Sequence, residues 1–146
     1  MTQIAWLNGE WTPLEDARVP ALDRGFVFGD GVYEVVPVYA GRKFRWAQHL
    51  ARLQRSLAAV SIRNPHDEAG WTRLVDELVA RHPWRDQFVY LQVTRGVARR
   101  DHAFPPSDVA PTVFAMTSEL VAPPAAQREQ GVDAITLPDE RWLHCD

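Results

Sequence analysis

The sequence predicts an α+β fold, on three observations. Short segments rich in valine, tyrosine and phenylalanine, which is typical of strands, lie near the start and the end of the first 120 residues. Two longer segments between them carry apolar residues at helical spacing. The resulting order is two strands, two strands, two helices and two strands, without the regular alternation of an α/β fold. At 146 residues, 46% hydrophobic with six tryptophans, the chain has enough apolar material for a packed core.

The first two strands are predicted to form a β-hairpin over residues 4–7 and 10–12. Asn8-Gly9 lies between them, and this dipeptide readily adopts the positive φ angles of a tight two-residue turn. We therefore expect the chain to begin with a closely paired antiparallel ribbon.

A strand over residues 32–39 follows, because valine and tyrosine favour extended backbone. Side chains alternate along a strand, so Tyr33 and Val35 share one face. The other face carries Val32, Glu34, Val36 and Val38. Pro37 has no N–H to donate, which places this strand at a sheet edge or at a bulge. A turn then leads to a short strand over residues 43–45.

Two amphipathic helices are predicted over residues 46–60 and 67–81. Their apolar residues recur every three or four positions and so share one face of each helix. In the first helix they are Trp46, Leu50, Leu53, Leu57 and Val60, and in the second Trp71, Leu74, Val75, Leu78 and Val79. Two longer strands, over residues 88–95 and 112–117, enclose a loop that contains adjacent prolines.

Three regions divide the chain: a small α+β domain over residues 1–120, an interdomain linker over 121–130 and the start of a larger domain over 131–146. The boundary follows from Pro123-Pro124, because adjacent prolines stiffen the backbone and cannot join a strand ladder. A strand is predicted over residues 131–138. A lone strand cannot bury itself, so we expect its sheet to come from outside these residues.

Composition argues against several classes of partner. A net charge of −3 and an isoelectric point near 5.9 disfavour nucleic acid and anionic membranes. No apolar run approaches the roughly 20 residues that cross a bilayer. The single cysteine, Cys145, excludes an intramolecular disulfide, and the first residues lack a signal-peptide pattern. We expect a cytoplasmic protein.

Arg100 and His102 form a candidate carboxylate-binding pair. On extended backbone a spacing of two residues puts both side chains on one side. The guanidinium can bond both oxygens of a carboxylate, and the imidazole can add a third donor. The alternative is that both side chains lie on a solvated turn.

Tyr33 and Arg52 each allow two interpretations. The Tyr33 phenol follows a glycine-rich turn and can donate into a cleft, or it can pack with its hydroxyl at the rim. Arg52 lies three residues after His49 and between the core positions Leu50 and Leu53. It is either a surface arginine with a buried stem or a cation available to an anion.

Two further motifs carry no predicted ligand. Phe28-Gly29-Asp30-Gly31 lacks the third glycine and the following helix of a dinucleotide fingerprint, so we assign its glycines to close backbone approach. His144, Cys145 and Asp146 are consecutive, and three successive residues cannot readily share one ion. We predict no metal site.

Four segments, taken together and in order, resemble the D-amino-acid aminotransferases of the fold-type IV, pyridoxal-phosphate-dependent aminotransferase family. They are DRGFVFGDGVYEVV at residues 23–36, HLARL at 49–53, RGVARRDH at 95–102 and RWLHCD at 141–146. The resemblance covers essentially the whole chain. It implies the small N-terminal α/β domain of that fold, followed by the first strand of the large cofactor-binding domain.

The resemblance also implies roles for the candidate residues. Tyr33, Arg100 and His102 would bind the substrate α-carboxylate, and Val35 would line the substrate pocket. Arg52 would contact the phosphate of pyridoxal 5'-phosphate. In relatives the arginine and histidine reach in from the other subunit, so a homodimer is implied.

The reaction implied by the resemblance is a ping-pong transamination in which D-alanine and 2-oxoglutarate give pyruvate and D-glutamate. The Schiff-base lysine is expected two residues after Asp146, so no catalytic residue lies within this chain. We therefore expect the isolated 146-residue chain to be inactive. His49 is expected to orient Arg52 or to pack beneath it.

Two alternatives stay open on sequence alone. The first is an R-selective amine transaminase, which has less need of the Arg100 and His102 pair, or a branched-chain-type relative of the same fold, whose corresponding loop would lack this pair. The second is a non-catalytic fragment that keeps an anion-binding pocket from Arg52, Arg100 and His102. Comparing D-alanine with an amine that lacks a carboxylate separates the R-selective amine transaminase from the main prediction.

Overall fold

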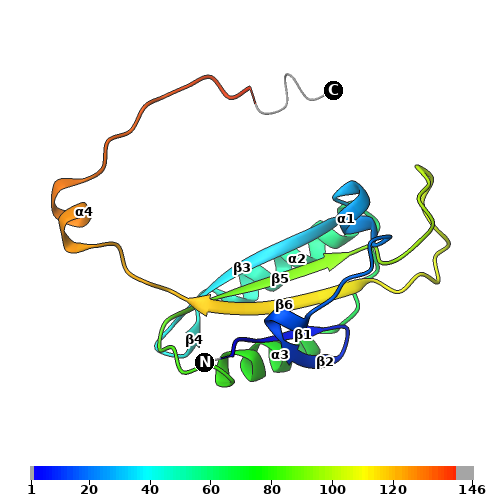
Figure 1. The fold of residues 1–146 in the computed structure, drawn as a ribbon, viewed down its shortest axis with the longest axis horizontal. Helices are drawn as coiled ribbons and strands as arrows, with labels where there is room; N and C mark the ends of the chain where they lie inside the picture. The colour runs from blue at the N-terminus through cyan, green and yellow to red at the C-terminus, as the bar shows by residue number, and fades with distance from the viewer. Residues whose placement is uncertain (1, 141–146) are drawn as a thin grey trace.

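A computed structural model describes residues 2–140 and confirms the α+β class (Figure 1). Its strands are β1 (Ile4–Leu7), β2 (Glu10–Pro13), β3 (Gly31–Tyr39), β4 (Arg42–Lys43), β5 (Gln87–Thr94) and β6 (Thr112–Glu119). Its helices are α1 (Arg24–Phe28), α2 (Trp46–Ala59), α3 (Glu68–Ala80) and α4 (Ala125–Gln130), with a 3-10 turn at Leu14–Asp16. The strands form one six-stranded antiparallel sheet in the order β2-β1-β6-β5-β3-β4.

The predicted hairpin is confirmed, and its turn is also tied to the sheet. Asn8 and Gly9 have φ angles of 50° and 104°. The Asn8 side chain accepts a hydrogen bond from the Val113 N–H at 2.8 Å, while the Asn8 N–H donates to the Val113 carbonyl at 3.0 Å. The turn residue therefore joins β1 to β6 as well as closing the hairpin.

The core lies between one face of the sheet and helices α2 and α3, which run behind the strands in Figure 1. Apolar side chains at helical spacing meet alternate side chains of β3, β5 and β6. Trp71 of α3 is fully buried, and its indole N–H donates to Asn64 Oδ1 at 2.9 Å. The helical members of the core are Leu50, Leu53, Leu57, Trp71, Leu74, Val75 and Leu78. Both predicted helices are thus confirmed.

Strand β3 alternates as predicted and has a partly free edge. Val36 and Val38 are fully buried toward the helices, whereas Tyr33 on the other face is 65% exposed. The Pro37 carbonyl accepts a hydrogen bond from Phe44, so the side of Pro37 that lacks an N–H faces β4 and not β5. β4 pairs only with the last two residues of β3, which leaves the rest of that edge unpaired by any described strand.

The 95–111 loop joins β5 to β6, and its second residue is a glycine that no other residue can replace without cost. Gly96 has φ +97°, and a Cβ built there would lie 2.0 Å from the Ala110 carbonyl oxygen. Gly9 has a similar φ of +104° but open space around it. The two glycines therefore separate backbone strain from steric overlap.

We expect Gly96→Ala to destabilise the fold more than Gly9→Ala. Gly9→Ala should cost about 1–2 kcal/mol through backbone strain alone. Gly96→Ala should cost about 3 kcal/mol or more, because its Cβ also collides with backbone that cannot move aside. Urea denaturation of the two variants measures the difference. Equal losses of unfolding free energy would show that the backbone of the 95–111 loop moves aside to admit the added Cβ.

The sequence did not predict helices α1 and α4. Helix α1 spans five residues and includes Gly25, so it shows no helical periodicity. Its start is fixed by Asp23, whose Oδ1 accepts from the Gly25 N–H at 2.8 Å, and its end by Gly29 at φ 66°. Helix α4 lies within the predicted linker and has no buried residue.

The strand predicted over residues 131–138 is absent. These residues form no regular secondary structure and are exposed, because no described strand lies beside them to pair with. All residues from 121 to 140 are exposed and arch away from the sheet (Figure 1). The 141–146 motif lies outside the described residues, so the assignment of residues 131–146 to a larger domain stays a prediction. No helix among residues 2–140 has the length and apolarity to span a membrane.

Candidate functional site

The uncovered face of the sheet carries a row of aromatic side chains. The Tyr33 ring on β3 stacks on the Tyr90 ring of β5, with centroids 5.8 Å apart and planes at 25°. The Tyr90 hydroxyl donates to Gln92 Oε1 at 2.9 Å. Burial, with a smaller effect of the neighbouring Tyr33, raises the pKa of Tyr90. Tyr33, which is 65% exposed, thus lies beside the partly buried ring of Tyr90 on this face.

Val35 lines a shallow apolar pocket on this same face, two residues along β3 from Tyr33. The pocket has a volume of about 290 Å³ and is lined by Val35, Phe88, Tyr90, Met116 and Ser118. A small apolar side chain fits such a pocket, whereas a charged side chain would lose its hydration there. Tyr33 and this pocket therefore lie on the same face of the sheet.

On the opposite face of β3, Glu34 holds both candidate residues of α2. Arg52 donates from Nε to Glu34 Oε1 and from Nη2 to Oε2, each at 2.6 Å, in a bidentate pair. His49 Nδ1 lies 2.8 Å from Glu34 Oε2. Because a carboxylate only accepts, His49 must carry its proton on Nδ1. His49 and Arg52 thus share one carboxylate, and Arg52 Nη2 also lies 3.4 Å from His49 Nδ1.

Sequence reasoning missed Glu34, although one signal pointed to it. Glu34 lies among valines on the buried face of β3, and its side chain is only 2% exposed. A carboxylate in that position requires a cation or several donors. Burial alone would raise the pKa of Glu34, but the hydrogen bonds and charges of Arg52 and His49 outweigh burial and lower it. Glu34 in turn raises the pKa of Arg52.

We expect acid to destabilise the fold through Glu34. Its folded pKa lies below the ordinary value of 4.5, so the unfolded chain takes up the proton first. Its contribution to the free energy of unfolding is complete above pH 4.5 and is lost as the pH falls through the folded pKa. Urea titrations across this range measure the slope. Glu34→Gln should flatten it, and an unchanged slope would show that Glu34 does not gain its stability from Arg52 and His49.

Around Arg52 the surface forms a cationic hollow. It has a volume of about 280 Å³ and is lined by Arg45, Gln48, His49, Arg52 and Arg55. Although Arg52 is paired with Glu34, its side chain is 58% exposed, and the Nη1 group makes no hydrogen bond within the described residues. A hollow with three guanidinium groups and one carboxylate keeps an excess of positive charge. Its donor set suits a phosphate dianion.

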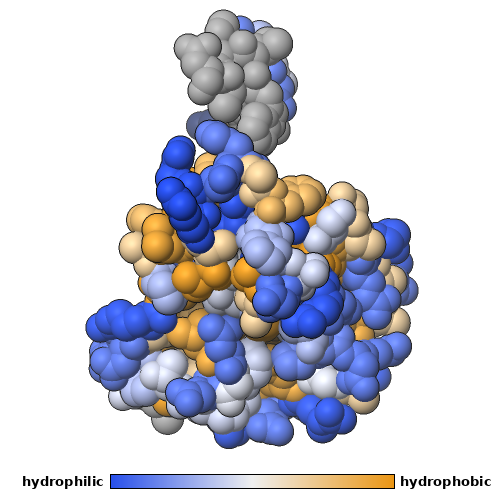
Figure 2. Space-filling view, turned by 90° about the vertical axis from the view of Figure 1, so that its right-hand side faces the viewer, coloured by the Kyte–Doolittle hydropathy of each residue, from blue (hydrophilic) through white to orange (hydrophobic). Residues whose placement is uncertain are grey.

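Arg100 and His102 lie beside one aromatic ring. The Arg100 guanidinium carbon is 5.2 Å from the centroid of the Phe28 ring, and the His102 ring centroid is 5.6 Å from it. Both side chains are exposed, at the end of the molecule where Leu22, Phe26 and Phe104 are also exposed. Figure 2 views this end and shows apolar surface between strongly hydrophilic side chains.

The structure brings the candidate residues together in three groups rather than one. Tyr33 and Val35 share the uncovered sheet face, Arg52 lies on the helix side of β3, and Arg100 with His102 occupies the 95–111 loop. Within residues 2–140 no hydrogen bond or ion pair joins Tyr33 to either loop residue. One copy of the described chain therefore presents the candidate residues as three separate groups.

Comparisons with known proteins identify relatives that match the whole length of this chain. A D-alanine aminotransferase of Staphylococcus epidermidis is 39% identical over 146 residues, which is 100% of this chain and 51% of the relative. A D-alanine aminotransferase of Bacillus licheniformis is 42% identical over 139 residues, or 95% of this chain and 48% of the relative. The chain thus spans about half the length of the curated relatives it matches.

Solved structures share the fold. A branched-chain amino acid aminotransferase of Escherichia coli matches with a TM-score of 0.75 at 18% identity, covering 87% of this chain and 43% of the other. A 4-amino-4-deoxychorismate lyase of Pseudomonas aeruginosa matches with a TM-score of 0.71 at 31% identity, covering 88% and 44%. The family model described as amino-transferase class IV matches residues 31–145. Sequence, fold and family model agree, and the chain belongs to the class IV aminotransferases.

Proposed function

We propose that this chain forms part of a pyridoxal-phosphate-dependent D-amino-acid transaminase that converts D-alanine and 2-oxoglutarate into pyruvate and D-glutamate by a ping-pong mechanism. One observation carries the proposal: Arg100 and His102 meet at one aromatic ring in a chain 36% to 42% identical to D-alanine aminotransferases. An amino acid and an oxo acid share an α-carboxylate. A site with two fixed donors for that group serves both half-reactions.

The cationic hollow around Arg52 fits the phosphate of pyridoxal 5'-phosphate. Arg52 would hold that phosphate, with Arg45 and Arg55 adding positive charge at the rim. Glu34 would keep the Arg52 guanidinium in one orientation, through two short hydrogen bonds. When bound, the cofactor supplies the electron sink and carries the amino group. The protein supplies position and charge.

The substrate carboxylate would be held by Tyr33, Arg100 and His102. The Arg100 guanidinium would bond both oxygens, and the imidazole and phenol would each donate once. The small side chain of D-alanine would lie toward Val35 and its apolar pocket. Holding the carboxylate at fixed points sets which face of Cα meets the proton-transferring group, and this explains a preference for one enantiomer.

A homodimer would complete this carboxylate site. No hydrogen bond or ion pair within residues 2–140 links Tyr33 to Arg100 or His102, and the loop residues lie exposed at the end of the molecule. We propose that the 95–111 loop of one copy closes over Tyr33 of the other. The lysine that would move the α-proton is proposed two residues after Asp146, so the isolated 146 residues would bind anions without turnover.

The test is an assay of amino-group transfer from D-alanine to 2-oxoglutarate by the complete polypeptide that carries these residues. L-alanine and an R-amine without a carboxylate serve as the comparison substrates, and the isolated 146-residue chain serves as the control. The proposal expects turnover of D-alanine by the complete polypeptide only. Faster turnover of the R-amine would favour an amine transaminase, and multiple turnovers by the 146-residue chain would contradict the assignment of the lysine.

A further inference from the structure

We infer that Arg24 is a positioning residue for the loop that carries Arg100 and His102, and that it works from an ion-paired cluster centred on Asp30. The inference rests on the proposed function for its catalytic readout. Its structural content stands on contacts among described residues. Arg24 contacts the backbone between the two loop residues and also the ring on which they lie.

The cluster joins two buried arginines through one carboxylate. Arg24 Nε donates to Asp30 Oδ2 at 2.8 Å, and Arg95 donates from Nε to Oδ2 at 2.7 Å and from Nη2 to Oδ1 at 3.0 Å. Arg24 is 5% exposed and Arg95 9% exposed. Because neither guanidinium has bulk water to turn into, both are held in a single orientation.

Arg24 extends from this cluster to the centre of the loop segment. Its Nη1 donates to the Asp101 carbonyl at 2.8 Å, and Asp101 lies between Arg100 and His102. Its guanidinium carbon also lies 4.7 Å from the centroid of the Phe28 ring, which both loop residues contact. One side chain thus fixes the backbone of the pair and its aromatic support.

The backbone before this point is fixed by the same segment. The Arg24 N–H donates to the Gly96 carbonyl at 2.9 Å, and Ala98 donates to the Leu22 carbonyl at 3.3 Å. Asp23 and Val97 form an antiparallel bridge. The start of the 95–111 loop therefore runs beside residues 22–24 and cannot swing away unless these bonds break.

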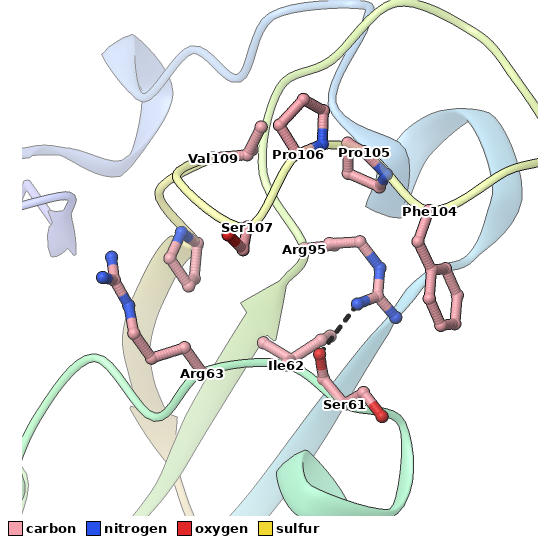
Figure 3. Close-up of a pocket in the computed structure, with 10 residues that line it drawn as sticks. Ser61, Ile62, Arg63, Arg95, Phe104, Pro105, Pro106, Ser107 and Val109 are labelled. Carbon is pink, nitrogen blue, oxygen red and sulfur yellow. Dashed lines mark hydrogen bonds between the residues drawn. The ribbon is translucent and has the colours of Figure 1, made fainter.

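Arg95 fixes the other limb of the loop. Its guanidinium donates to the carbonyls of Ser61 at 2.9 Å and Val60 at 2.7 Å, and it lies 4.2 Å from the centroid of the Phe104 ring. Figure 3 shows this arrangement at a pocket of about 250 Å³, with Phe104 beside the arginine and adjacent prolines continuing the loop. The Arg100 and His102 segment is thus supported on both sides by the two arginines of Asp30.

Arg24→Lys separates positioning from stability. A lysine ammonium keeps a positive charge beside Asp30, but it is one point charge and cannot reproduce the fork that reaches Asp30 and the Asp101 carbonyl together. Arg73→Lys makes the same exchange at an exposed position on α3 and is the matched control. Both variants are made in the complete polypeptide.

We expect Arg24→Lys to raise KM for D-alanine about 5- to 20-fold, the effect of losing one charge-assisted hydrogen bond at the loop. The value of kcat should stay within about twofold of the parent. Turnover of an amine without a carboxylate should not change. Hydrogen exchange of residues 96–103 should become about tenfold faster, since their opening would no longer break the bond to Arg24. Arg73→Lys should match the parent in every readout.

Two results would overturn the inference. The first is hydrogen exchange of residues 96–103 that is unchanged in Arg24→Lys. The second is a KM for D-alanine that is the same in Arg24→Lys as in the parent, provided that the parent turns over D-alanine. A parent that does not turn over D-alanine contradicts the proposed function instead, and hydrogen exchange then decides the positioning role alone. If Arg24→Lys does not fold, Phe28→Leu removes the shared ring while keeping Arg24. An unchanged KM for D-alanine in that variant would overturn the inference.

Discussion

Replacing Arg100 with alanine should lower kcat/KM for D-alanine by about 100- to 1,000-fold. Arg100 would make two charge-assisted hydrogen bonds to the substrate carboxylate, each worth about 1.5–3 kcal/mol, of which water recovers a part in the variant. Its side chain is exposed and its guanidinium lies over the Phe28 ring, so its loss leaves no buried hydrogen-bond partner unsatisfied. Steady-state kinetics of the complete polypeptide measures the effect.

Arg99→Ala is the matched control for this prediction. Arg99 is the preceding residue, is also exposed and carries the same charge, so general electrostatic attraction of substrate changes equally in both variants. Arg99→Ala should stay within about threefold of the parent. Rapid turnover of D-alanine by Arg100→Ala would remove this arginine from the proposed carboxylate site.

Replacing Asp30 with asparagine should lower the free energy of unfolding by about 3–5 kcal/mol, because it leaves two buried guanidinium charges without a counter-charge. The side chains of Arg24 and Arg95 are 6% and 10% exposed. Burial alone would raise the pKa of Asp30, but the hydrogen bonds and charges of Arg95 and Arg24 lower it below its ordinary value of 3.8. The stabilisation by Asp30 is therefore complete above that value and is lost as the pH falls through the folded pKa.

The surface pair of Lys43 and Asp76 provides the control for Asp30. Asp76 has a side chain 60% exposed, and exposed pairs are typically worth about 0–1 kcal/mol. Asp76→Asn should therefore leave the unfolding midpoint in urea almost unchanged, whereas Asp30→Asn should lower it clearly at neutral pH. Equal shifts for the two variants would mean that the Asp30 cluster is no more important to the fold than a surface ion pair.

Most of the fold could be predicted because its signals are local. The Asn8-Gly9 turn, the alternation along β3 and the apolar spacing of α2 and α3 each follow from neighbouring residues, and the structure confirms all of them. The failures have different causes. Helix α1 is too short to show helical periodicity and is held by its caps at Asp23 and Gly29, whereas the strand predicted over residues 131–138 depends on a partner that the described residues do not include.

In the candidate site, too, local features could be predicted from the sequence and contacts between distant residues could not. Alternation along β3 predicted that Tyr33 and Val35 would share a face, and the structure confirms that placement. The partners of the charged residues could not be predicted, because Glu34 meets Arg52 across 18 positions and Asp30 meets Arg95 across 65. A buried carboxylate on a strand signals that it needs a cation. Only the fold shows which cation supplies it.

The visible absorption spectrum of the complete polypeptide, recorded before and after addition of D-alanine, tests the central claim most directly. L-alanine is the control. The account predicts a visible band from protein-bound pyridoxal phosphate that is lost with D-alanine and retained with L-alanine, because the carboxylate site presents one enantiomer to the cofactor. Absence of the band, or its equal loss with both enantiomers, would contradict the assignment of this chain to a D-amino-acid transaminase.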